Sequence, residues 1–204
     1  MVPTWLKTLF PRRSSRTKTT PRPRPAARPN LVQLEDRATP AVVSIADASI
    51  LEGNAGTQTL MFTVTADAAE AKDITFKINT AALTATAGVD YVALSNVGGK
   101  IDAGNTSTTV MVTINGDNTV ELDETFKVTL GTLSAGNTFA GGGATESATG
   151  TITNDDTATI SFGASPSATE GGMFDFTVTI SNPVDVAVTA NRETVDGTAL
   201  AASD

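Results

Sequence analysis

Apolar and polar side chains alternate along most of the chain after residue 40. Clusters rich in glycine, asparagine and aspartate separate the alternating runs, for example Gly53-Asn54-Ala55-Gly56 and Ala103-Gly104-Asn105. Alternation with a period of two residues is typical of half-buried antiparallel strands, and such clusters are typical of turns. The pattern predicts seven strands, at residues 42–46, 58–66, 73–79, 98–102, 106–114, 124–132 and 147–153.

Seven short strands in about 115 residues indicate an all-β fold, an immunoglobulin-like seven-strand antiparallel sandwich over residues 41–156. The chain has 204 residues, and 40% of them are hydrophobic. That is enough for one or two small domains with apolar cores.

Acidic side chains are concentrated beside the predicted strands. Asp117, Glu121 and Glu124 lie within eight residues, and Asp155-Asp156 follow the seventh strand. Carboxylates this close repel one another unless a cation neutralises them, and calcium takes six to eight oxygen ligands from such groups. The alternative, a solvated acidic turn, remains open at this point because runs of charge commonly face solvent.

Strand order indicates where these acids meet. If each strand reverses the one before it, the connections after strands one, three and five and the exit from strand seven lie at one end. We call this end the acidic pole, and its seven carboxylates are Glu52, Asp90, Asp117, Glu121, Glu124, Asp155 and Asp156. Seven carboxylates could supply the ligands of one calcium ion, or of two with shared ligands and backbone carbonyls.

The first 40 residues have a different character from the rest of the chain. They hold nine Lys and Arg against two Asp and Glu, whereas residues 41–204 hold five against twenty. Proline is frequent between the arginines, which predicts a basic, disordered leader. Its apolar patch is too short for a transmembrane helix, and no aromatic residues interleave with the arginines, so neither a membrane span nor nucleic-acid binding is expected.

Leu34-Glu35-Asp36-Arg37, with Pro40 three residues later, resembles the L-E-D-R-x-x-P element found near the N-termini of large bacterial surface and exported proteins. The resemblance implies export to the extracellular space or display at the cell surface, with membrane association as a further option. An ordinary linker is the alternative interpretation.

Four motifs in residues 44–156 together resemble the Calx-beta domain. They are Glu52-Gly53, Gly88-Val89-Asp90-Tyr91, the Gly116-Asp117 to Asp123-Glu124-Thr125-Phe126 stretch, and Thr151-Ile152-Thr153-Asn154-Asp155-Asp156. This family of immunoglobulin-like sandwiches is known from sodium-calcium exchangers, an integrin beta subunit and repeated modules of bacterial surface proteins. The resemblance implies that the seven carboxylates of the acidic pole hold calcium and that Thr119 offers a backbone carbonyl.

Two positions depart from the family's tightest calcium binders. Gly116 and Asn154 stand where those members carry aspartates, while Asp123 is not a usual ligand position. Fewer charged ligands lower the affinity, so we expect weak binding, at roughly 0.1 to 1 mM.

Residues 157–204 repeat the start of the first module. Ile160 and Phe162 match the opening strand, Glu170-Gly171 matches Glu52-Gly53, and the alternating residues 174–180 match the second strand. The repeat then reaches the place of Asp90, after the third strand, at residues 196–204. Three of seven strands cannot close a sandwich, so an incomplete second copy with open apolar faces is expected. The chain is therefore expected to be a fragment or a truncated gene product of a longer array.

These observations favour a calcium-binding module in which calcium stiffens the repeat array for adhesion or cell communication. Its expected partners are calcium, other repeats, and extracellular protein or carbohydrate ligands. A metal-free structural spacer is the alternative. Catalysis is not expected, because the chain lacks histidine and cysteine and has one Trp and one Tyr with which to line a substrate cleft.

Overall fold

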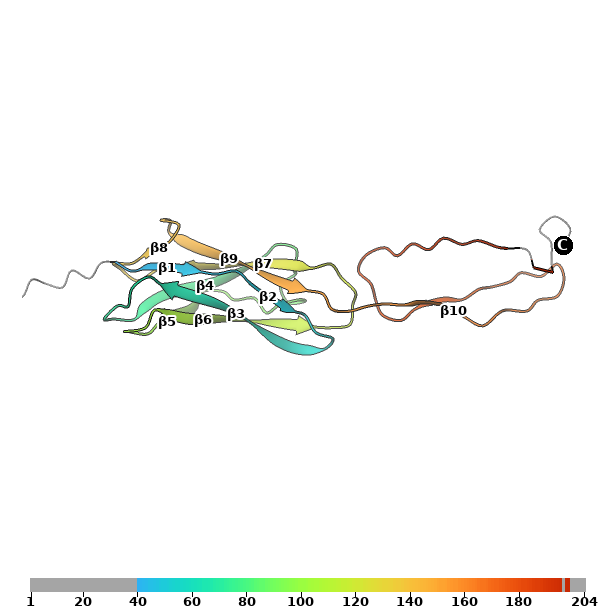
Figure 1. The fold of residues 1–204 in the computed structure, drawn as a ribbon, viewed down its shortest axis with the longest axis horizontal. Coiled ribbons are helices and arrows are strands. Elements are labelled where there is room, and N and C mark those ends of the chain that lie inside the picture. The colour runs from blue at the N-terminus through green and yellow to red at the C-terminus, as the bar shows by residue number, and fades with distance from the viewer. Residues whose placement is uncertain (1–39, 196, 199–204) are drawn as a thin grey trace, which may run out of the picture. The chain divides into compact units, whose positions relative to one another are not determined.

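A computed structural model describes residues 40–195, 197 and 198. The predicted leader therefore lies outside the described residues, apart from Pro40. The described residues form strands and no helix (Figure 1). The strands are β1 (Val42–Ile45), β2 (Ala48–Leu51), β3 (Gly56–Ala66), β4 (Ile74–Ala82), β5 (Val97–Ile101), β6 (Ser107–Gly116), β7 (Glu124–Gly131), β8 (Thr138–Phe139), β9 (Thr145–Thr153), β10 (Ile160–Phe162) and β11 (Val178–Ile180).

The first nine strands build a sandwich of two sheets, with strand orders β6-β3-β1-β8 and β2-β9-β7-β4-β5. Each of the seven predicted strands overlaps one of these nine, so the predicted all-β sandwich is confirmed. The prediction missed β2 and β8, which pair in parallel with β9 and β1, so the sheets are not purely antiparallel. Both strands are short, and their pairing partners are far away in the sequence.

Alternating side chains of the two sheets form one apolar core. Phe62 on β3 and Phe126 on β7 meet edge to face across the sandwich, with ring centroids 6.0 Å apart. Tyr91, from the β4–β5 connection, stacks on Phe126 at 4.4 Å. All three side chains are completely buried, so the core reaches the end of the sandwich at which the β4–β5 connection lies.

The second module begins with a two-stranded ladder, β10 with β11. Its register matches that of β1 with β3: Ser161 and Thr179 share a hydroxyl–hydroxyl hydrogen bond of 2.8 Å, as Ser44 and Thr65 do. The strand predicted over residues 174–180 is shorter in the structure, because only residues 178–180 pair.

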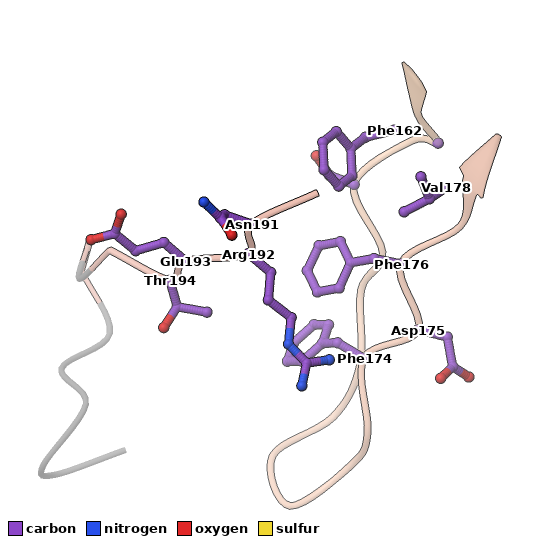
Figure 2. A pocket seen from close by; sticks show the side chains of 11 residues that line it. Phe162, Phe174, Asp175, Phe176, Val178, Asn191, Arg192, Glu193 and Thr194 are labelled. Carbon is purple, nitrogen blue, oxygen red and sulfur yellow. The ribbon is translucent and has the colours of Figure 1, made fainter. Parts of the chain in front are cut away.

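The apolar side chains of the second module remain exposed. Figure 2 shows Phe162, Phe174, Phe176 and Val178 around an open pocket that Arg192 also lines. Phe176 is 65% exposed, whereas Phe62, in the corresponding Phe-Thr-Val-Thr sequence of β3, is completely buried. The open apolar face predicted for the incomplete copy is therefore present.

Candidate metal centre

The acidic pole lies where β2, β6 and β9 end, and these three ends meet at one end of the sandwich (Figure 1). The seven carboxylates come from four segments that are distant in the sequence. Glu52 follows β2, Asp90 lies in the β4–β5 connection, the 117–124 stretch leads into β7, and residues 155 and 156 follow β9. The strand order predicted from the sequence places these segments at the same end, as the structure does.

Hydrogen bonds and packing hold the β4–β5 connection in place at Asp90. The Asp90 carbonyl accepts a hydrogen bond from Asn115 N–H on β6 at 2.9 Å. Its carboxylate Oδ2 accepts one from Thr86 N–H at 2.6 Å, and the neighbouring Tyr91 is locked against Phe126. Asp90 is therefore held rigidly at the centre of the pole, with its side chain buried.

Three carboxylates form the centre of the acidic pole. Asp90, Glu121 and Glu124 each place one oxygen within 4.8 Å of the others. Such a spacing suits oxygens that share one cation, since calcium–oxygen distances are about 2.3 to 2.6 Å.

Burial and mutual repulsion act strongly on these groups. Burial raises the pKa of the Glu52 carboxyl to about 7, and the charges of Glu121, Asp117, Asp90 and Asp156 add to the shift. Both effects disfavour the ionised form. Glu52 is therefore a carboxyl whose charge is costly in the metal-free protein.

Glu124 behaves in the same way. Burial raises its pKa to about 7, helped by a hydrogen bond to Asp90 and by the charges of Asp90, Glu121 and Glu52. The pKa of Glu121 is also raised, first by burial and then by neighbouring carboxylates. In the described part of the chain the ion pairs join Lys100 to Asp73 and Asp102, so no described Lys or Arg pairs with the acidic pole.

The segment after β9 closes the pole against the turn after β2. Gly53 N–H donates to Asp155 Oδ1 at 2.9 Å, and Asn54 Nδ2 donates to Asp156 Oδ1. Asp156 is 5% exposed, and its second oxygen, Oδ2, has no hydrogen-bond partner. A buried carboxylate oxygen without a partner is costly, so a ligand is expected to satisfy it.

Asn154 links the segment after β9 to the β6–β7 connection by hydrogen bonds. Its Oδ1 accepts from Glu121 N–H at 3.2 Å, and its Nδ2 donates to the Asp156 carbonyl at 3.2 Å. Its own N–H donates to Asp123 Oδ1 at 3.2 Å. An aspartate at position 154 could not donate the hydrogen bond that Nδ2 makes. The side-chain amide of Asn154 thus links the β6–β7 connection to the segment after β9.

Gly116, the other departure, marks a close approach of two backbones. A Cβ atom at this position would lie 2.1 Å from the Gly53 carbonyl oxygen and 2.9 Å from that of Glu52. Gln58 Nε2 also donates to the Glu52 carbonyl at 3.0 Å. The end of β6 therefore supports the turn that carries Glu52, and a side chain at position 116 does not fit this arrangement.

The predicted ligands differ in their exposure to solvent. Glu52, Asp90 and Asp156 are buried, Glu121 and Glu124 are half-buried, and Asp117 and Asp155 are exposed. Asp117 Oδ1 accepts from Thr119 N–H at 2.6 Å, which fixes the turn after β6. Asp123 is exposed, as expected of a residue outside the ligand set.

Sequence reasoning missed several contributors. Asn54 and Gln58 orient the turn after β2 through side-chain amides, and Asp185 of the second module is close enough to help raise the pKa of Glu121. No pattern in the sequence marks Asp185, because its position depends on how the second module meets the β6–β7 connection.

A model of the Calx-beta domain matches residues 36–157 and again residues 153–204. The chain belongs to the Calx-beta family. The second match covers the residues that follow the first module, including the repeated motifs after Asp156. No curated protein matches the chain.

Solved structures of Calx domains are similar to this Calx-beta protein. One is the crystal structure of CBD12 from CALX1.2, at 21% identity and a TM-score of 0.46, covering 56% of this chain and 45% of that one. Another is the apo form of the Calx CBD1 domain, at 22% identity and a TM-score of 0.45, covering 57% of this chain and 98% of that one. A third is the calcium binding domain CBD12 of CALX1.1, at 20% identity and a TM-score of 0.47, covering 56% and 44%. The chain thus spans less than half the length of the two CBD12 structures.

The described residues include no helix of the length and apolar character needed to cross a membrane.

Proposed function

We propose that the acidic pole of residues 41–156 binds calcium. The observation that carries this proposal is the convergence of Asp90, Glu121 and Glu124, with oxygens within 4.8 Å of one another and no described cationic side chain paired to them. Hard, oxygen-rich donor sets of this kind suit calcium. The unpartnered Asp156 Oδ2 supports the proposal independently.

The donor set fits calcium in kind and in number. Glu52, Asp90 and Asp156 would hold the ion from the buried side, and Asp117 and Asp155 would reach it from solvent. Burial, and then the neighbouring carboxylates, raise the pKa of Glu52 and Glu124, and a divalent cation would neutralise the repulsion between these carboxylates. The exposed ligands and the uncharged residues at positions 116 and 154 support an affinity in the roughly 0.1 to 1 mM range of extracellular modules.

The proposed role follows from where the ion binds. Asp155 and Asp156 lie directly before the second module, so a bound ion would stiffen the junction between repeats. A stiffened array suits adhesion or cell communication, with other repeats and extracellular proteins or carbohydrates as partners. The proposed activity is binding and not catalysis.

The proposed location is the extracellular space or the cell surface, with membrane association as an option. It is supported by the resemblance of Leu34-Glu35-Asp36-Arg37 and Pro40 to the N-terminal element of exported bacterial proteins. An extracellular location would also supply calcium at the millimolar concentrations that weak sites require.

Isothermal titration of the full chain with calcium chloride tests the binding proposal. We expect saturable binding, and a loss of at least tenfold in affinity for the double variant Asp90→Asn/Glu124→Gln, because two central charges are removed. Asp102→Asn, an exposed acid paired with Lys100, is the matched control and should bind as the wild type does. Heat that does not saturate would identify the module as a metal-free spacer, and equal affinity in the double variant would contradict a calcium site at the acidic pole.

A further inference from the structure

Val120 lies between Asp117 and Glu121 and is held by the second module. Its N–H donates to the Pro183 carbonyl at 2.9 Å, and its carbonyl accepts from Asp185 N–H at 3.1 Å. Val120 and Val184 thereby form an isolated parallel β-bridge. The β6–β7 connection, which carries part of the candidate calcium site, is thus hydrogen-bonded to the second module through both backbone groups of Val120.

The bonded segment has a defined place in the repeat. The β10–β11 register and its Ser161–Thr179 hydroxyl bond reproduce the β1–β3 pair, so β11 corresponds to the end of β3. Residues 183–185 therefore belong to the connection that follows the third strand of a repeat. In the first module the equivalent connection, between β3 and β4, lies at the end opposite the acidic pole. The acidic pole of the first module therefore contacts the opposite end of the second module.

The contact also brings a further carboxylate to the pole. Asp185 donates its N–H to the carbonyl of Val120, the residue directly before Glu121, so the bridge brings Asp185 to the edge of the acidic pole. The Asp185 N–H is fixed by Val120, so the residue is anchored beside the loop. An eighth carboxylate next to an already repulsive cluster is unfavourable unless a cation is present.

We propose that the second repeat is part of the cation site of the first: residues 183–185 hold the loop between Asp117 and Glu121, and the Asp185 carboxylate strengthens cation binding there. This inference rests on the proposed calcium binding. The buried, unpartnered Asp156 Oδ2 at the same pole indicates a ligand independently of the acidic composition. Because coupling between two sites is reciprocal, a bound cation must in turn stabilise the contact between the repeats.

Calcium titration of the full chain and of Asp185→Asn tests the charge contribution. The substitution removes the charge and keeps the backbone N–H that bonds Val120. We expect affinity to fall roughly threefold to tenfold at low salt, and less at about 1 M salt, because a nearby charge acts through a screened Coulomb interaction. Asp175→Asn, another acid of the second module, is the matched control and should leave the affinity unchanged.

Hydrogen exchange of the wild-type chain tests the backbone contact. Calcium should slow exchange of the Val120 and Asp185 amide protons, since cation binding and the bridge stabilise each other. Wild-type affinity in Asp185→Asn, or equal exchange with and without calcium, would overturn the inference and leave the proposed calcium site standing. A wild-type chain that binds no calcium would overturn both.

Discussion

Glu52 is a residue whose negative charge is unfavourable in the folded protein without a bound cation. The side chain is buried at the end of β2, and its neighbours at the acidic pole are carboxylates. Its pKa rises from 4.5 to about 7, and that of Glu124 rises likewise. Both residues therefore bind protons more tightly in the folded chain than in the unfolded chain.

This difference predicts how stability depends on pH in chelator. A carboxyl whose pKa is higher in the folded state stabilises the fold at low pH, and that contribution is lost as pH rises through the folded pKa. The melting temperature of the metal-free chain should therefore fall between pH 5 and pH 8, by several degrees. Thermal unfolding in chelator at pH 5, 6, 7 and 8 measures this fall in melting temperature.

The Glu52→Gln variant is the control for this prediction, because it cannot ionise at that position. Its melting temperature should decline less over the same pH range. A wild-type melting temperature that rises from pH 5 to pH 8 in chelator would show that these carboxyls are not destabilising.

Gly116→Ala tests the support that β6 gives to the turn carrying Glu52. The new Cβ would lie 2.1 Å from the Gly53 carbonyl oxygen, so the turn must move. We expect a loss of about 1 to 3 kcal/mol in the free energy of unfolding, measured by urea denaturation, together with weaker calcium binding. Gly98→Ala is the control, because the nearest atom to a Cβ there is Lys77 Nζ at 4.0 Å. Equal stability of the two variants would contradict the close approach.

The sequence was sufficient to predict which acids share one end of the sandwich. Successive predicted strands run in opposite directions, so every second connection lies at the same end. It was not sufficient to predict the roles of Gly116 and Asn154. Both were interpreted as missing ligands, yet one allows two backbones to touch and the other bridges Glu121 and Asp156. Contacts of this kind depend on the packing of distant segments, which a single sequence does not display.

At the scale of elements, the long strands were predictable and the short edge strands were not. β3, β6, β7 and β9 each carry several buried apolar residues in alternation, which is a local signal. β2 has four residues, none of them buried, and it forms where the chain crosses between the sheets to pair with β9. Its existence depends on that pairing.

Gly150→Ala tests how β9 packs on the aromatic core. A Cβ at this position would lie 2.5 Å from the Phe126 ring and 2.8 Å from the Phe62 ring. The rings are held edge to face, so they cannot both move aside without losing contacts. We expect destabilisation of about 1 to 3 kcal/mol in urea denaturation.

Gly131→Ala is the matched control on β7. The nearest atom to its Cβ would be Thr145 Cγ2 at 3.7 Å, an ordinary contact distance. Its stability should be close to that of the wild type. If Gly150→Ala were equally stable, the interface between Phe62, Phe126 and β9 would be looser than described.

At the scale of the molecule, the two repeats share a strand register but differ in how far their apolar side chains are buried. Val64 of β3 is completely buried by the opposite sheet, whereas Val178 of β11 occupies the same place in its ladder and is 55% exposed. An exposed apolar face was expected of the second module, and in the described residues its strands are β10 and β11, whereas the first module has two facing sheets. The contact through Val120 was not predictable, since it joins loops with no shared pattern.

The central claim, that the acidic pole is a calcium site, is tested most directly by thermal unfolding of the full chain. Unfolding would be followed in chelator and then in calcium from micromolar to about 10 mM, with magnesium as the comparison. Binding to the folded state alone adds about 2.7 kcal/mol at a hundredfold excess over Kd. We predict a saturable rise of several degrees in melting temperature with calcium and little change with magnesium. A melting temperature that does not respond to calcium would contradict the account and leave a structural spacer with a solvated acidic end.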